Sequence, residues 1–127
     1  MNIHKVLLGA ILIKPDLAPY SLPDLEIEHF PADLQPVFAA LSGLWNAKGQ
    51  LDAVEACSRY PEQRTAIMEC VEECEGEYIA ITRDRVEEWT QLVRERAALT
   101  QFQSLALQAG SNLTTFAWEI TTQFGVP

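Results

Sequence analysis

Residues 82–109 read TRDRVEEWTQLVRERAALTQFQSLALQA, the longest uninterrupted helical pattern in the chain. Thr82 is suited to cap the start of this helix, and Asp84 in the first turn complements the positive end of the helix dipole. The next residue that favours a helix stop is Gly110, because glycine adopts the left-handed conformation at a C-terminus at little cost. The sequence therefore predicts a helix over Thr82–Ala109.

Two apolar stripes run along this predicted helix at helical spacing. The first stripe consists of Val86, Trp89, Val93 and Ala97, and the second of Leu92, Leu99, Phe102, Ala106 and Ala109. A helix on the surface of a small domain needs only one such stripe to bind its own core. We therefore expect one stripe to pack on the chain's own domain and the other to be covered by a second helix or a second chain.

Length and composition indicate one globular domain, with or without an appendage. The chain has 127 residues, 48% of them hydrophobic, and a net charge of −9. A domain of this size can bury enough surface to fold without a disulfide or a metal. Because affinity for duplex DNA comes largely from Lys and Arg, this acidic chain is not expected to bind nucleic acid directly. It has no glycine-rich phosphate loop, so no ATPase site is expected.

The termini and cysteines predict a cytoplasmic protein. The apolar run Val6–Ile13 is too short to span a membrane, and it lacks the flanks of a secretory signal. Three cysteines cannot form a complete disulfide framework, which favours a reducing compartment.

The first eighty residues read as a helical head. We expect a helix over Asn2–Ile13, in which Gly9 allows close approach of another backbone. Five prolines within residues 15–36 predict short turns rather than one element. Further helices are expected from the N-cap Asp33 to about Ala47, from Asp52 to before Pro61, and over Glu62–Cys74.

After Gly110 the spacing predicts a last helix over Leu113–Phe124. It would fold back on the second stripe across the turn Gly110-Ser111-Asn112 and form a helical hairpin. Trp118 falls about half a turn from the apolar side of this helix, which makes it a candidate contact with another subunit. The predicted fold is all-α, with a small helical bundle (1–80) as the head and a C-terminal helical hairpin (81–127) for self-association.

Candidate sites of catalysis or metal binding have simpler structural explanations. Cys70 and Cys74 could share one helix face and bind zinc with His4, His29 or Cys57, but free cysteines usually pack as small hydrophobic residues. The carboxylates of Glu72, Glu73, Asp84 and Glu87 are more simply a solvated face than a hydrolase site. We expect no catalytic residue, no metal and no cofactor on this chain.

Several segments, in order along the chain, resemble the N-terminal domain of DnaB-type replicative helicases. They are VLLGAIL (6–12), EHF (28–30), VFAAL (37–41), GQLDAV (49–54) and LVRERAAL (92–99). No single motif is specific, and the ordered set carries the resemblance. Residues 2–5 and the pair Leu34 and Gln35 depart from the family pattern.

The resemblance implies an all-α head with a C-terminal hairpin that pairs between subunits. In that family six such domains form a collar, a trimer of dimers, that receives primase and influences loader contacts. The ATPase motor of the parent helicase lies in a separate domain. The chain would then be such a collar domain, or alternatively a stand-alone adaptor, for instance from a mobile element, that binds a helicase or primase.

The predicted interface combines the second stripe with the last helix. Its residues are Leu92, Arg96, Leu99, Phe102, Ala106, Phe116, Trp118 and Ile120. Arg96 could be plain surface charge, or it could bond across the hairpin or to a paired subunit. The second stripe could be covered entirely by the last helix, but a dimer contact also explains Trp118. The expected partners are further copies of the chain, in a dimer or in a hexamer, and primase or a helicase loader, with no membrane contact.

Overall fold

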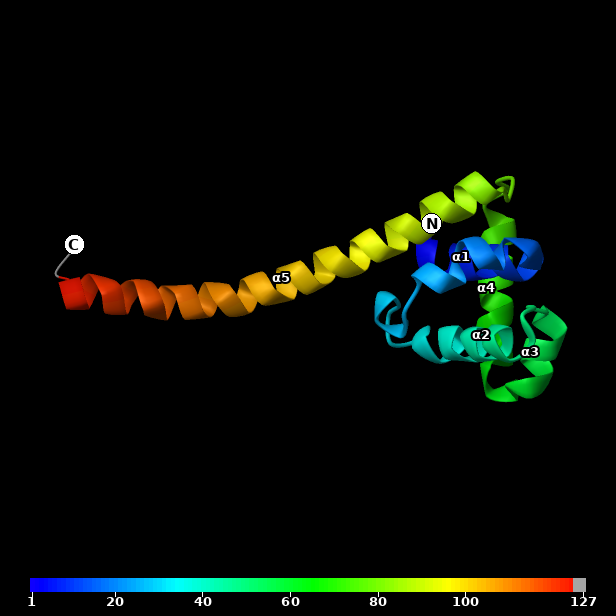
Figure 1. Cartoon of the computed structure of the whole chain (residues 1–127), viewed down its shortest axis with the longest axis horizontal. Helices are drawn as coiled ribbons and strands as arrows, with labels where there is room; N and C mark the ends of the chain where they lie inside the picture. Colours follow the sequence, from blue (N-terminus) through cyan, green and yellow to red (C-terminus); the bar gives the residue numbers. More distant parts are fainter. Residues whose placement is uncertain (125–127) are drawn as a thin grey trace. The chain divides into compact units, whose positions relative to one another are not determined.

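The computed structural model describes the backbone of residues 1–124 and the side chains of residues 1–107. It is all-α, and the described residues contain no strand (Figure 1). The α-helices are α1 (Ile3–Ile13), α2 (Gln35–Lys48), α3 (Ala53–Arg59), α4 (Arg64–Gly76) and α5 (Arg83–Phe124). Four short 3-10 helices lie between them: η1 (Pro15–Tyr20), η2 (Leu22–Asp24), η3 (Ile27–His29) and η4 (Pro61–Gln63).

The ends of the helices follow from local chemistry. Asp52 caps α3 through a hydrogen bond from the Val54 N–H, at 2.8 Å, as expected. Thr82 caps the start of α5, where its hydroxyl accepts from the Arg85 N–H at 3.2 Å. Gly49 ends α2 in the left-handed conformation, with φ of 68°. The expected cap at Asp33 is wrong: Leu34 stands at the N-cap, and α2 begins at Gln35.

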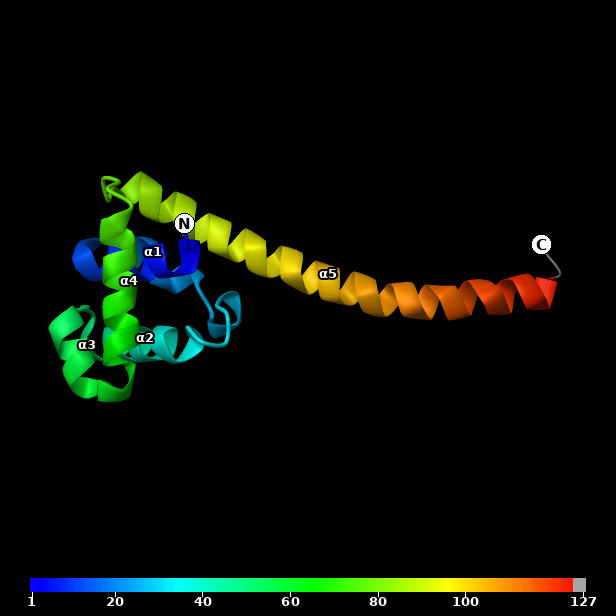
Figure 2. The ribbon, with the colours of Figure 1, turned by 180° about the vertical axis from the view of Figure 1, so that it is seen from behind.

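The core of the first part of the chain is built around the crossing of α1 and α4 (Figure 2). Eight of the eleven residues of α1 are buried. A methyl group placed on Gly9 would lie 2.1 Å from the carbonyl oxygen of Cys70, so the two backbones touch at this point. The predicted close approach at Gly9 is therefore confirmed. Glycine destabilises a helix interior, but only a residue without a side chain allows the two backbones to come this close.

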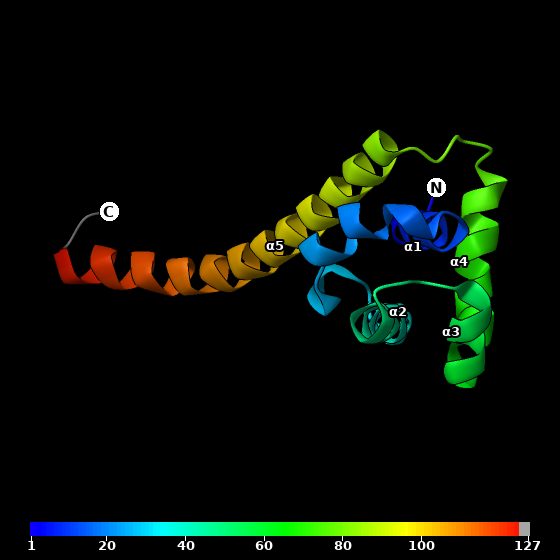
Figure 3. The ribbon, with the colours of Figure 1, turned by 45° about the vertical axis from the view of Figure 1, so that its right-hand side comes forward.

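The first stripe of α5 completes this core. A connection over residues 77–82 leads from α4 to the start of α5 (Figure 3). Val86, Trp89 and Val93 are buried in the hydrophobic cluster formed with α1, α2 and α4, and Ala97 is half-buried. The prediction that one stripe packs on the chain's own domain is confirmed for these three residues.

The expected turn at Gly110 is not present. Helix α5 runs without a break from Arg83 to Phe124, through Gly110, Ser111 and Asn112, so the predicted hairpin is not confirmed. A single glycine inside a helix costs only about 1 kcal/mol relative to alanine, and no proline follows to stop the helix. A lone glycine at position 110 is therefore not enough to end the helix.

By its contacts the chain divides into two compact units, Met1–Glu95 and Arg96–Pro127. The first unit thus includes the first turns of α5, with Val86, Trp89 and Val93. The assignment of residues 81–127 to self-association remains a prediction.

Candidate self-association surface

The second stripe of α5 is exposed wherever its side chains are described. The exposed fraction is 55% for Leu99 and 68% for Phe102, and Ala106 is also exposed. Leu92, in the first unit, is just exposed at 37%. These residues are therefore available to a partner. Phe116, Trp118 and Ile120 lie outside the residues whose side chains the structure describes.

Two further exposed leucines were not among the predicted interface residues, and of these only Leu105 lies beside the stripe. Leu105 and Leu107 are both largely exposed, Leu107 at 78%. Leu105 follows Phe102 by three residues, so one turn of the helix brings the two positions together. The spacing of three residues between Phe102 and Leu105 was the signal in the sequence that could have identified Leu105.

Arg96 is exposed, and the structure gives its guanidinium no ion pair within the described residues. Its backbone carbonyl accepts a hydrogen bond from the Thr100 hydroxyl at 2.9 Å. The expected bond across a hairpin has no counterpart here, since α5 does not turn back. Its exposed guanidinium is therefore accessible both to solvent and to a second chain.

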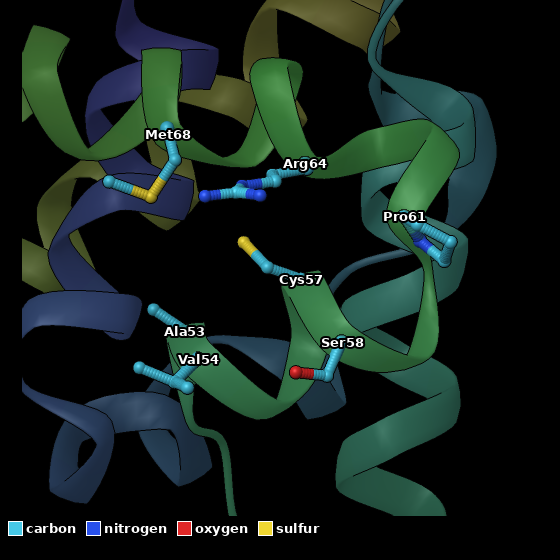
Figure 4. A pocket seen from close by; sticks show the side chains of 7 residues that line it. All are labelled: Ala53, Val54, Cys57, Ser58, Pro61, Arg64 and Met68. Atoms are coloured by element: carbon cyan, nitrogen blue, oxygen red, sulfur yellow. The ribbon is translucent and has the colours of Figure 1, made fainter.

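A separate shallow groove of about 530 Å³ lies between α3 and α4 (Figure 4). Its lining residues are Ala53, Val54, Cys57, Ser58, Pro61, Arg64 and Met68. Figure 4 shows the side chains of Cys57, Arg64 and Met68 directed toward the same space. These seven residues offer an apolar surface with one guanidinium, one thiol and one hydroxyl, but no carboxylate or imidazole for acid–base chemistry.

The two cysteines of α4 have a packing role. Cys70 and Cys74 are buried against α1, and their side of α4 faces Gly9. Burial raises the pKa of the Cys70 thiol to about 12, and burial also raises the pKa of Cys74. Among the described residues, no three His, Cys, Asp or Glu side chains converge on one point.

His29 has a structural role as well. Its Nδ1 accepts a hydrogen bond from the Glu26 N–H at 2.9 Å, which closes the start of η3. The following residue, Phe30, stacks on Phe38 with ring centroids 4.7 Å apart and meets the ring of His4 edge-on. These contacts fix the turn that leads into α2.

No protein-family model, curated protein or solved structure matches the chain. Within the described residues, no helix combines the length and apolar character that crossing a bilayer requires.

Proposed function

We propose that this protein is a non-catalytic self-association module whose contact surface is the second stripe of α5. One observation carries the proposal: Leu99 and Phe102 are exposed by 55% and 68% on the same helix whose first stripe is buried. Water contact with several large apolar side chains on one helix face is unfavourable, and a partner removes it. Burial of a phenylalanine side chain contributes about 1.5–3 kcal/mol.

The resemblance to DnaB-type helicases gives this module a place in DNA replication. On that basis it is the collar domain of a replicative helicase, which brings subunits together as dimers and hexamers and receives primase or a loader. The all-α first unit and the absence of a phosphate loop from the sequence support this proposal. The alternative is a stand-alone adaptor that binds a helicase or primase. An open reading frame that continues past residue 127 into a phosphate loop would favour the collar domain over the adaptor.

The self-association is tested by sedimentation equilibrium of the whole chain across micromolar concentrations. We expect a reversible dimer or higher oligomer for the unchanged protein. Phe102→Ala removes apolar area from each copy, so we expect the dissociation constant to rise at least about tenfold. Gln101→Ala, one residue away and exposed, is the matched control and should leave the constant unchanged.

A strict monomer at high micromolar concentration would contradict the proposal. So would an equal loss of affinity in Phe102→Ala and Gln101→Ala, because the association would then not depend on the apolar stripe. Circular dichroism of both variants shows whether the first unit keeps its helices, which separates a lost contact from a lost fold.

A further inference from the structure

The exposed residues of α5 follow a seven-residue repeat. Leu92, Leu99 and Ala106 are spaced by seven, and Phe102 follows Leu99 by three. The first series, Leu92, Leu99 and Ala106, continues in the sequence to positions 113 and 120 (Leu, Ile). The second series begins at Phe102 and continues to positions 109 and 116 (Ala, Phe). Alternating spacings of three and four are the a and d positions of a coiled coil.

The backbone is continuous over this whole repeat. Helix α5 includes every position from 92 to 120 without a turn, so both series can lie along one seam. At a rise of 1.5 Å per residue the seam is roughly 43 Å long. A strict seven-residue repeat sustained over about four heptads favours a left-handed supercoil with another helix that carries the same repeat.

The lack of charge at the positions that flank the seam is compatible with a second copy of this chain as the other helix. Charged residues at the e and g positions usually set partner choice, and like charges there repel an identical chain. Residues 97–118 contain no Asp, Glu, Lys or Arg. A second copy of this chain therefore meets no like charge along the middle of the seam.

Charge also distinguishes the two possible directions. The whole net charge of −9 lies in residues 1–95, because the only charged residues after Glu95 are Arg96 and Glu119, which cancel. Parallel pairing would bring two such acidic units to the same end of the seam. It would also place Glu95, at a d position, opposite its own copy. Antiparallel pairing separates the two units and lets the two helix dipoles oppose each other.

We propose that α5 of two copies pairs as an antiparallel two-stranded coiled coil along the seam that runs from Leu92 to Ile120. This inference rests on the proposed self-association and adds to it the partner helix, the seam and the direction. The seam includes Leu99, Phe102 and Ala106. It excludes Leu107, which lies about 100° around the helix from Ala106.

The seam is tested with two leucines that are both exposed. We expect Leu99→Lys to abolish the dimer in sedimentation equilibrium, because it places a charge at an a position. Leu107→Lys, which makes the same chemical change outside the seam, should leave the dissociation constant within about twofold of the unchanged protein. Equal losses in the two variants would overturn the coiled coil while leaving self-association standing, and a monomeric parent protein would overturn both.

The direction is tested by the distance between two spin labels. The label is attached at Arg94→Cys, an exposed position outside the seam, in a Cys57→Ser background, with Cys70 and Cys74 protected by burial. Antiparallel pairing places the two labels more than about 30 Å apart, since residue 94 lies near one end of a roughly 43 Å seam. Parallel pairing would hold them near 20–25 Å, given helix axes about 10 Å apart, and that result would overturn the proposed direction.

Discussion

The hydroxyl oxygens of Ser21 and Thr90 lie 2.7 Å apart, and both side chains are buried. Thr90 Oγ1 also lies 2.7 Å from the carbonyl oxygen of Val86. A carbonyl can only accept, and Thr90 has a single hydroxyl hydrogen, so Thr90 donates to Val86 and Ser21 donates to Thr90. This pair ties the turn between η1 and η2 to the first turns of α5, two segments that are 69 residues apart.

Removal of the Thr90 hydroxyl should therefore destabilise the first unit. Thr90→Val keeps the shape of the side chain but leaves the Ser21 hydroxyl buried without an acceptor. We expect the free energy of unfolding to fall by about 1–3 kcal/mol. Urea denaturation followed by circular dichroism measures it.

Thr100→Val is the matched control for this change. Thr100 makes the same kind of bond to its own helix, from its hydroxyl to the Arg96 carbonyl at 2.9 Å, but it is exposed. We expect a change within about 0.5 kcal/mol. If the two threonine variants behave alike, the Ser21 contact contributes nothing to stability.

The crossing of α1 and α4 should tolerate no side chain at position 9. Gly9→Ala places a methyl group 2.1 Å from the Cys70 carbonyl oxygen and 2.8 Å from Cys74 Cβ, so the helices must separate. We expect a loss of at least about 1–3 kcal/mol, the usual cost of overpacking. Gly76→Ala, with nothing within 4 Å of the added methyl group, serves as the control and should be neutral or slightly stabilising. Thermal melts of both variants measure the effect. Equal melting temperatures would rule out the contact between the backbones at Gly9 and Cys70.

Leu41 should be one of the most sensitive positions of the core. It is fully buried on α2, so Leu41→Ala removes apolar contacts and leaves a cavity. We expect a loss of about 2–5 kcal/mol in the free energy of unfolding. The exposed Val54 on α3 offers a comparison, and Val54→Ala should change stability by less than about 0.5 kcal/mol. An effect at Leu41 below measurement error would remove that residue from the core.

The three thiols should differ in reactivity. In the native protein at pH 8 we expect the half-buried Cys57 to react with a thiol reagent first, while Cys70 and Cys74 react only when denaturant opens the first unit. Rapid modification of all three without denaturant would show that the contact between α1 and α4 opens readily.

Stability should also fall at high pH, partly because of Cys70. Its pKa is raised in the folded state from 9.0 to about 12, since burial disfavours the thiolate. The unfolded chain therefore loses this proton first, and stability that is present below pH 9 is lost as the pH rises toward 12. In Cys70→Ala the decline of the unfolding free energy over this window should be shallower than in the unchanged protein or in Cys57→Ser. If the unfolding free energy declines with pH equally steeply in all three proteins, the raised pKa of Cys70 is contradicted.

Two glycines should respond to alanine with opposite signs. Gly110 lies within α5, so Gly110→Ala should raise the helical signal at 222 nm and stabilise α5 by about 1 kcal/mol. Gly49 has φ of 68°, and Gly49→Ala should destabilise α2 by about 1 kcal/mol. A loss of helicity in Gly110→Ala would instead favour the turn and the hairpin that the sequence predicted.

Much of the first unit could be predicted from sequence because its signals are local. Thr82 and Asp52 cap their helices through hydrogen bonds to residues two or three positions further on, and Gly49 ends α2 by its own backbone conformation. The stripe of Val86, Trp89 and Val93 follows the helical period. Such features need no knowledge of distant residues, so periodicity and capping rules find them.

The sequence by itself determined the all-α class, the buried stripe of α5 and the close approach at Gly9. It predicted that the second stripe is covered by a helix or a second chain, whereas the structure shows Leu99 and Phe102 of that stripe exposed. Only the tertiary structure decided that Cys70 is what Gly9 touches, that Ser21 meets Thr90, and that α5 continues through Gly110. The physical reason is that the first two contacts join residues far apart in the sequence. The third depends on a balance of about 1 kcal/mol between helix and turn, which the local pattern at Gly110 leaves undecided.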